Sequence, residues 1–280
     1  MRAVSIILVL ILGVIISLSA IAKDKTLEMI ILGENETYSG SIDGEDNLII
    51  SIWNMLRVES PIKLSVGYQQ VSMSRSWAEL IRLDNACVMN KLKTADRLDI
   101  AEYSQYPLSV FPPIRLITLA RNESRFKSPF SFQQLEHNPA LKLGVVKSRT
   151  YGVELDAQIE KYAKHIFTRG GIDSSDKLVD MLLAGRLDGI LEYTLSIEGY
   201  LQDEGIDERV IALPITDISE LMLGYIACSK TIKGGAIIDA INSSFTKPGV
   251  SQAYIDMHIN HFGVTEAELL KPKLDSLFTQ

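Results

Sequence analysis

The segment from Ser148 to Tyr151 brings hydroxyl groups, a guanidinium and backbone N–H groups together in four residues. It follows an apolar run, residues 143–146, and precedes a helical pattern that begins at Val153. Free N–H groups at the start of a helix favour anionic groups. The segment could therefore bind a carboxylate or a phosphate; the alternative is that its hydroxyls only cap the helix.

Arg97 ends the sequence Thr94-Ala95-Asp96-Arg97. The planar guanidinium of an arginine can hold a carboxylate through two parallel hydrogen bonds. The alternative is a solvated arginine at the start of a helix, paired with Asp96 or Asp99.

Metal and nucleophile chemistry have weaker support. His258 and His261 are three residues apart in a helical pattern with Asp256 nearby, so they could share a face and bind a metal. We expect surface histidines instead. The sequence contains no Gly-x-Ser-x-Gly, His-Glu-x-x-His, Walker or Gly-x-Gly-x-x-Gly motif. We therefore expect no catalytic residues, no metal and no cofactor.

The elements that must position these residues alternate between short β-rich runs and helical patterns. The order strand, helix, strand, helix, strand occurs twice, which predicts two doubly wound α/β lobes with largely parallel sheets. In the second unit, Ser174 or Ser175 is expected to cap a helix that ends at Gly185. The expected strands are 29–32, 64–68, 86–89, 114–120, 143–146, 166–167, 189–191 and 223–227.

The charge balance and the apolar N-terminal segment indicate the class of protein and its location. The 280 residues carry 28 Lys+Arg against 35 Asp+Glu, without a basic run, which disfavours a nucleic-acid binder. Residues 3–22 carry no charge, follow Arg2 and end in Ala20-Ile21-Ala22. This pattern predicts a signal peptide over residues 1–22 and export to the periplasm; the alternative is an uncleaved membrane anchor.

The two cysteines, Cys87 and Cys228, lie in short apolar runs that are typical of buried strands. An exported protein can oxidise its thiols, but these two could pair only if their strands are neighbours. We expect two buried thiols.

Four segments in order resemble the type II periplasmic solute-binding proteins of ABC transporters, family 3, the amino-acid-binding-like group. They are LKTADRLDIAEYSQYPL (92–108), LGVVKSRTYG (143–152), LVDMLLAGRLDGILEY (178–193), and LGYIACSK (223–230) followed by AINSSF (240–245). The resemblance implies a Venus-flytrap fold whose two lobes are joined by a hinge around a ligand cleft. Lobe 1 is expected to be discontinuous, with residues 23–121 and 217–280, and lobe 2 to hold residues 122–216.

The same resemblance implies roles for individual residues. Arg97 is expected to clamp a ligand carboxylate, and Asn90 to bind the same group. Tyr38 is expected to place its ring over the ligand, and Arg75 to be a second anion contact, beside Trp77 in the core.

The sequence departs from the resembled pattern at Tyr193, where amino-acid binders place an acidic residue that holds the ligand ammonium. Glu192 precedes it, but adjacent strand residues face opposite sides, so Glu192 is no automatic substitute. An aromatic ring can also hold a cation. The complete set of expected ligand-binding residues is Arg97, Asn90, Tyr38, Arg75, Arg149, Thr150, Tyr151, Glu192 and Tyr193.

The resemblance implies an exported, monomeric protein that binds a small polar or anionic solute, amino-acid-like and carboxylate-bearing, and delivers it to the membrane permease of an ABC importer. One alternative is a ligand-sensing accessory protein for a membrane-bound signalling partner. A cleft enzyme such as a dehydratase is another, and it would require a carboxylate without an ion partner in the cleft, with Glu192 as the candidate.

Overall fold

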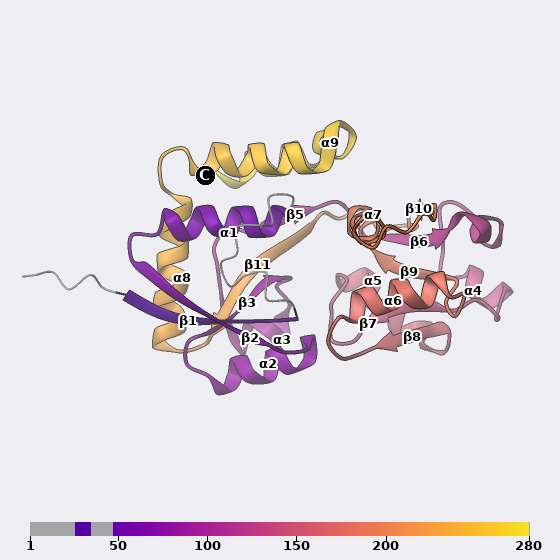
Figure 1. Cartoon of the computed structure of the whole chain (residues 1–280), viewed down its shortest axis with the longest axis horizontal. Helices are drawn as coiled ribbons and strands as arrows, with labels where there is room; N and C mark the ends of the chain where they lie inside the picture. Colours follow the sequence, from indigo (N-terminus) through magenta and orange to yellow (C-terminus); the bar gives the residue numbers. More distant parts are fainter. Residues whose placement is uncertain (1–25, 35–46, 280) are drawn as a thin grey trace, which may run out of the picture.

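The structure, a computed structural model, describes residues 26–34 and 47–279, and only the backbone of residues 263–265. The expected signal peptide and Tyr38 lie outside the described residues. Figure 1 shows two α/β lobes side by side, as the sequence predicts. None of the described helices is both long enough and apolar enough to cross a membrane.

The first lobe is built on a sheet of six strands in the order β2-β1-β3-β11-β4, with β5 also paired to β11. Strands β1, β2 and β3 are parallel, whereas β11 runs antiparallel to β3, β4 and β5. The bounds are β1 Thr26–Gly33, β2 Lys63–Gln70, β3 Ala86–Lys91, β4 Ala101–Tyr103, β5 Ser109–Phe111 and β11 Met222–Ser229.

The second lobe repeats this arrangement in five strands, in the order β8-β7-β9-β6-β10. Strands β7, β8 and β9 are parallel, and β6 is antiparallel to both β9 and β10. In each sheet, the strand that runs antiparallel to its neighbours is the first one after the chain arrives from the other lobe, β11 in the first sheet and β6 in the second. The bounds are β6 Arg115–Leu119, β7 Leu143–Val146, β8 Ile166–Arg169, β9 Gly189–Glu192 and β10 Val210–Leu213.

The chain passes between the sheets twice, and the first passage lies earlier than expected. The prediction placed it at Arg121, but β6 already pairs with β9 and β10, so the passage lies between Phe111 and Arg115. The sequence there is Pro112-Pro113. Because proline has no N–H to donate to a sheet, these residues end β5 before β6 starts. The return lies between Leu213 and Met222, an interval that contains the expected position.

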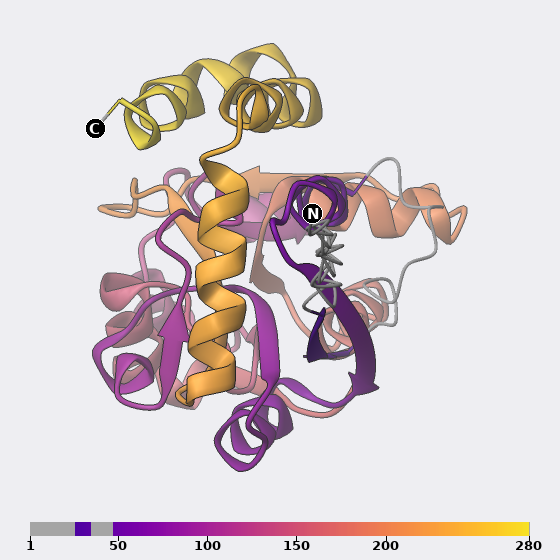
Figure 2. The same cartoon turned by 90° about the vertical axis from the view of Figure 1, so that its left-hand side faces the viewer.

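The helices of the first lobe cover both faces of its sheet (Figures 1 and 2). The side chain of Asn47 accepts hydrogen bonds from the N–H groups of Ile49 and Ile50 and so caps α1, which buries Trp53 completely. The one-turn helix α3 carries Arg97. The bounds are α1 Leu48–Val58, α2 Met73–Arg82, α3 Ala95–Leu98, α8 Ile232–Phe245 and α9 Val250–Leu277.

The helices of the second lobe include α6, whose ends test the capping prediction. Its N-cap is Asp173, in the left-handed conformation with φ 57°, so Ser174 and Ser175 lie inside the helix and not at its cap. Gly185 adopts φ 68° just beyond the helix, as expected. The bounds are η2 Ala120–Arg125, α4 Gln134–His137, α5 Val153–Lys161, η3 Ala163–His165, α6 Ser174–Leu183 and α7 Thr194–Asp203.

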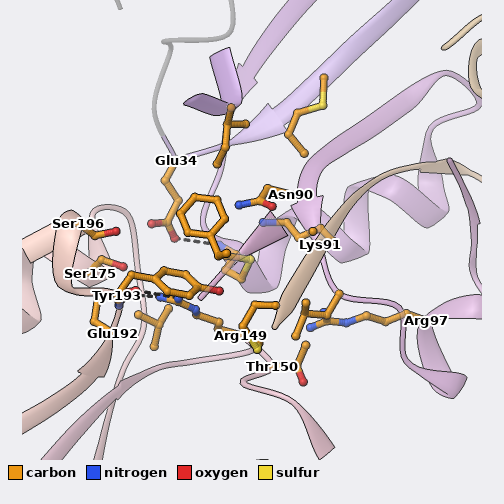
Figure 3. A pocket seen from close by; sticks show the side chains of 18 residues that line it. Glu34, Asn90, Lys91, Arg97, Arg149, Thr150, Ser175, Glu192, Tyr193 and Ser196 are labelled. Carbon is orange, nitrogen blue, oxygen red and sulfur yellow. Dashed lines mark hydrogen bonds and ion pairs between the residues drawn. The ribbon is translucent and has the colours of Figure 1, made fainter. Parts of the chain in front are cut away.

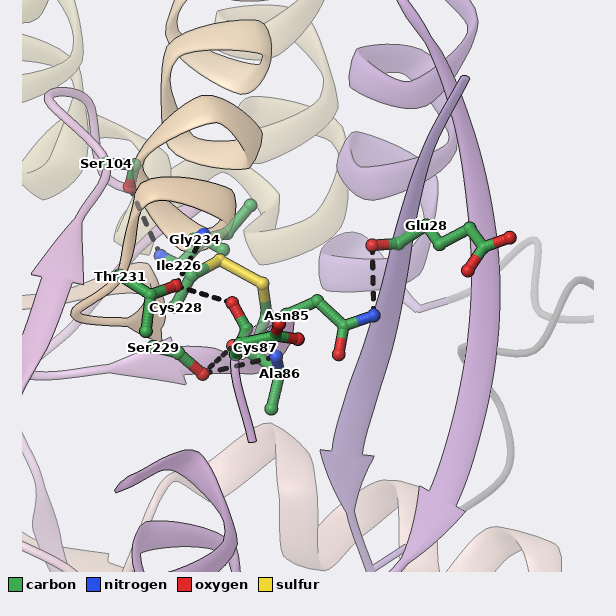
Figure 4. Close-up of a disulfide and its surroundings, with 11 residues drawn as sticks. Glu28, Asn85, Ala86, Cys87, Ser104, Ile226, Cys228, Ser229, Thr231 and Gly234 are labelled. Atoms are coloured by element: carbon green, nitrogen blue, oxygen red, sulfur yellow. Dashed lines mark hydrogen bonds between the residues drawn. A yellow bond between two sulfur atoms is a disulfide. The ribbon is translucent and has the colours of Figure 1, made fainter. Parts of the chain in front are cut away.

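A disulfide joins Cys87 to Cys228, so the expectation of two free thiols is wrong (Figure 4). The two residues face each other across the β3–β11 pair and are fully buried. The sequence could not show that strands 141 residues apart are neighbours. The bond ties together the two separate chain segments that make up the first lobe.

The C-terminal helix α9 packs over the first lobe and is fixed to the strand that precedes the hinge. His258 is fully buried, which corrects the expectation of a surface histidine. Its Nε2 accepts from the N–H of Val110 at 3.0 Å, and its Nδ1 lies 2.8 Å from the carbonyl of Tyr254. Both ring nitrogens are therefore used within the fold, and no group that could hold a metal occurs among the described residues.

Candidate functional site: a pocket between the two lobes

A pocket of about 310 Å³ lies between the lobes, a size typical of sites for small molecules. Its wall is formed where strands of both sheets end and where helices begin, which is the usual ligand position in open α/β sheets (Figure 3). The lining residues are Glu34, Ile49, Met73, Met89, Asn90, Lys91, Leu92, Arg97, Phe111, Val146, Arg149, Thr150, Ser175, Glu192, Tyr193, Ser196, Met222 and Gly224.

Arg97 reaches the pocket from α3 and contacts both lobes. Its guanidinium carbon lies 4.5 Å from the centre of the Trp77 ring, and its Nη2 donates to the carbonyl of Ser148 at 3.0 Å. The side chain is held by stacking on one lobe and by a hydrogen bond to the other. A guanidinium has five N–H donors, so others remain for a ligand.

Lys91, the last residue of β3, points into the pocket without an ion pair or hydrogen bond to any described residue. The pKa of its ammonium is lowered to about 8, mainly by burial and also by the charges of Arg97 and Arg149, while Glu34 opposes this effect. A lysine that shares a pocket with two arginines gains from a bound anion, because the anion offsets their mutual repulsion.

Asn90 is fixed at the back of the pocket and requires a glycine opposite. It has φ 56°, and its Oδ1 accepts from the hydroxyl of Ser109 at 2.6 Å. A Cβ on Gly224 would lie 1.6 Å from that Oδ1. Only glycine at position 224 therefore leaves room for this side chain.

Arg149 and Glu192 form an ion pair on the second-lobe wall. Arg149 Nη1 lies 2.5 Å from Glu192 Oε2, and Nη2 lies 2.8 Å from Oε1, so the contact is bidentate. The N–H of Tyr193 also donates to Oε1 at 3.0 Å. The side chains are 19% and 7% exposed, respectively. Because Glu192 has an ion partner, it lacks the feature that the enzyme alternative requires.

An aromatic contact also joins the lobes beside the pocket. The rings of Phe111 and Tyr193 lie 4.7 Å apart, and Phe111 packs edge-on against Phe262 of α9 at 5.1 Å. Arg115, at the start of β6, forms an ion pair with Glu266 of α9 at 3.5 Å. The helix therefore contacts both sides of the first passage between the lobes.

Helix N-termini from both lobes face the pocket. Ser175 and Ser196 lie in the first turns of α6 and α7, and Glu34 accepts from the N–H of Met73 at the start of α2. The exposed N–H groups and the helix dipole give these ends partial positive charge. They add to the positive potential of the cavity.

The structure brings six of the nine predicted site residues into the pocket wall: Arg97, Asn90, Arg149, Thr150, Glu192 and Tyr193. Tyr151 is 2% exposed and lies behind the wall, where its hydroxyl accepts from the N–H of Val146. Arg75 is contradicted as an anion contact, since it is exposed and pairs with Glu79 on its own helix at 2.5 Å. The hydroxyl of Thr150 donates to Asp156, one turn into α5, whose N-cap is Gly152 without a side-chain hydrogen bond, so Thr150 does not cap this helix.

Sequence reasoning missed two charged residues of the wall, Lys91 and Glu34. Lys91 ends β3 and Glu34 follows β1, each two residues beyond the predicted runs 86–89 and 29–32. The rule that ligands gather at strand carboxyl ends could have found both. The serines of α6 and α7 follow from the same rule, applied to helix starts.

Comparisons with known proteins show the fold. No protein-family model matches the chain, and no curated protein matches its sequence. Among solved structures, an ABC uptake transporter substrate-binding protein from Streptococcus pneumoniae with bound histidine has a TM-score of 0.63 at 14% identity, covering 85% of this chain and 94% of its own. A histidine kinase sensor domain with similarity to periplasmic binding proteins has a TM-score of 0.63 at 11% sequence identity, and the match covers 86% of this chain and 99% of that one.

A structure from a study of glutathione import through the cystine ABC importer of Streptococcus mutans has a TM-score of 0.59 at 18% identity, covering 90% of this chain and 95% of that one. By their descriptions, the first two of these structures are a substrate-binding protein and a sensor domain. The chain therefore has the two-lobed fold of the type II periplasmic solute-binding proteins.

Proposed function

We propose that this chain, which has the fold of the type II periplasmic solute-binding proteins, is an exported protein that captures a small carboxylate-bearing solute and delivers it to an ABC importer. The ligand lies between the lobes, and its carboxylate is held by Arg97. Closure of the lobes around the ligand gives the form that a membrane permease would recognise. The protein binds its solute without changing it.

The observation that carries this proposal is the position of Arg97. Arg97 is 9% exposed, and its guanidinium is stacked on Trp77 and bonds across the pocket to Ser148. A ligand carboxylate on its remaining donors would therefore bind in direct contact with both lobes. Such a ligand stabilises the closed arrangement because it contacts groups that separate when the lobes open.

The test is a thermal-shift and calorimetric screen of the protein against amino acids and other small carboxylates. A ligand at one hundred times its Kd stabilises the folded state by about 2.7 kcal/mol. For a chain of this size, that energy raises Tm by roughly 5 to 10 °C. Arg97→Ala should abolish the shift.

The matched control is Arg186→Ala, because Arg186 is exposed beyond the other end of α6 and does not line the pocket. It should keep the full shift. An unchanged response in Arg97→Ala would contradict the binding role of that residue. The absence of a shift with every carboxylate and amino acid would overturn the proposed function.

The sensing alternative has one specific point in its favour, the likeness to a histidine kinase sensor domain. The two functions differ in what loss of the protein does to a cell. If the protein serves an importer, deletion stops uptake of the radiolabelled ligand. If it serves a sensor, uptake persists and the transcriptional response to the ligand is lost.

A further inference from the structure

The charges that line the pocket are not balanced. Among the described residues of the wall, the cations are Lys91, Arg97 and Arg149 and the carboxylates are Glu34 and Glu192. Arg149 and Glu192 neutralise each other in their bidentate pair. No described carboxylate forms an ion pair with Lys91 or Arg97, while Glu34 accepts from the N–H of Met73. Three cations against two carboxylates give the wall a net charge of +1, and both Lys91 and Arg97 are available to an anionic ligand.

The same inventory leaves little for a ligand ammonium. Both oxygens of Glu192 accept from Arg149, and one of them also accepts from the N–H of Tyr193. Withdrawing Glu192 would leave Arg149 as an unpaired charge in a largely enclosed wall, which is strongly unfavourable. A ligand ammonium would also lie among three cationic side chains, and the other carboxylate of the wall, Glu34, already accepts from the N–H of Met73.

The wall that carries the two available cations also carries apolar side chains. Figure 3 shows Lys91 and Arg97 at different places on the wall. Met73, Met89, Phe111 and Met222 also line the cavity. A solute with an anionic group at each end of a short methylene spacer could use both cations and place its spacer against these apolar side chains.

We propose that the solute is a short dicarboxylate, with one carboxylate on Arg97 and the other on Lys91, and that an α-ammonium group does not contribute to its recognition. This inference rests on the proposed function, since it names the class of solute held at the same site. It separates this chain from binders that hold an amino acid by both of its charged ends.

Binding of such a ligand should depend on pH through Lys91. The groups that face its ammonium are Arg97 from α3, Arg149 from the loop after β7 and Glu34 from the end of β1. The pKa of Lys91 is about 8 in the free protein, and a carboxylate placed on it raises that pKa. The complex then holds a proton that the free protein loses above pH 8, so affinity should fall as the pH rises through 8.

The experiment compares ligands that differ only by the α-ammonium, namely glutarate against glutamate and succinate against aspartate, by isothermal titration calorimetry. Glutarate or succinate should bind at least tenfold more tightly than its amino acid. Lys91→Met should weaken dicarboxylate binding at least tenfold and remove the fall above pH 8. The control is Lys63→Met, an exposed lysine at the start of β2, which should change neither.

The outcomes distinguish this inference from the proposed function. Tighter binding of glutamate or aspartate, with loss of binding in Arg97→Ala, would overturn the dicarboxylate assignment and leave the solute-binding function intact. Preference for a monophosphate ester over both dicarboxylates would also overturn it. Binding of none of these compounds or of any amino acid would overturn both.

Discussion

Removing the disulfide between Cys87 and Cys228 should destabilise the first lobe and leave the second almost unchanged. In the chain-entropy account, a crosslink that closes a loop of 141 residues restricts the unfolded chain by about 5 kcal/mol. Measured values for native disulfides are more often about 2 to 5 kcal/mol. With a urea m-value of about 2 kcal/mol per molar, the midpoint should move down by roughly 1 to 2.5 M.

The assay can report the first lobe alone, because both tryptophans of the chain belong to it. Trp53 lies in α1 and Trp77 in α2. Tryptophan fluorescence against urea therefore follows the first lobe, while far-UV circular dichroism follows both lobes. The Cys87→Ala/Cys228→Ala variant should lose stability in the fluorescence signal.

The reduced wild-type protein is the matched control, since it keeps both sulfur atoms and lacks only the bond. It should be refolded from urea in the presence of reductant, because the disulfide is fully buried. A shift in the variant but not in reduced wild type would assign the loss to the missing atoms. A fluorescence midpoint that moves by less than about 0.5 M in both would refute the crosslink argument.

Three further predictions follow from single contacts. Gly234→Ala would place a Cβ 1.9 Å from a backbone oxygen and should lower the free energy of unfolding by about 1 to 3 kcal/mol. Gly235→Ala has open space for its Cβ and should raise the free energy of unfolding by up to about 1 kcal/mol. The urea midpoints of the two variants should therefore shift in opposite directions. Glu192→Gln should cost about 3 to 5 kcal/mol because it leaves Arg149 unpaired in a largely enclosed wall, and a second-lobe unfolding transition that stays in place would contradict this. Burial lowers the pKa of His258 to about 4, so between pH 6.5 and 4 the unfolded state binds a proton that the folded state does not. The stability that this residue contributes is therefore present above pH 6.5 and falls by about 3 kcal/mol towards pH 4. In thermal or urea melts over that range, the free energy of unfolding of His258→Gln should depend less on pH than that of the wild type. An equal dependence in both proteins would contradict the role of His258.

Much of the fold follows from local patterns in the sequence. Eight of the eleven described strands follow from hydrophobic spacing, and the end of α6 follows from the left-handed Gly185. The short strands β4, β5 and β10 were not predicted. The first passage between the lobes was placed too late because β6 is as apolar as a strand of the first sheet, and only its pairing with β9 assigns it to the second. The disulfide was missed for the same reason, because only the pairing of β3 with β11 brings Cys87 and Cys228 together.

The site was partly predictable for the same reason. Arg97 and Asn90 lie close together in the sequence after a buried strand, so they could be found as one group. The partner of a charge could not be found this way. Arg75 looked available but pairs with Glu79 one turn along its helix, and Glu192 is bound by Arg149 from another loop. Such choices depend on side-chain positions that no local pattern specifies.

The disulfide also determines how the molecule would carry a mechanical load. A pull applied at β1 and at the far end of α9 runs along the chain to Cys87, crosses the sulfur bridge to Cys228 and continues to the helix. The residues between the two cysteines, which include the whole second lobe and most of the pocket wall, lie outside that path. In the oxidised protein, tension on these ends would unfold the parts of the first lobe that lie before Cys87 and after Cys228, without extending the second lobe.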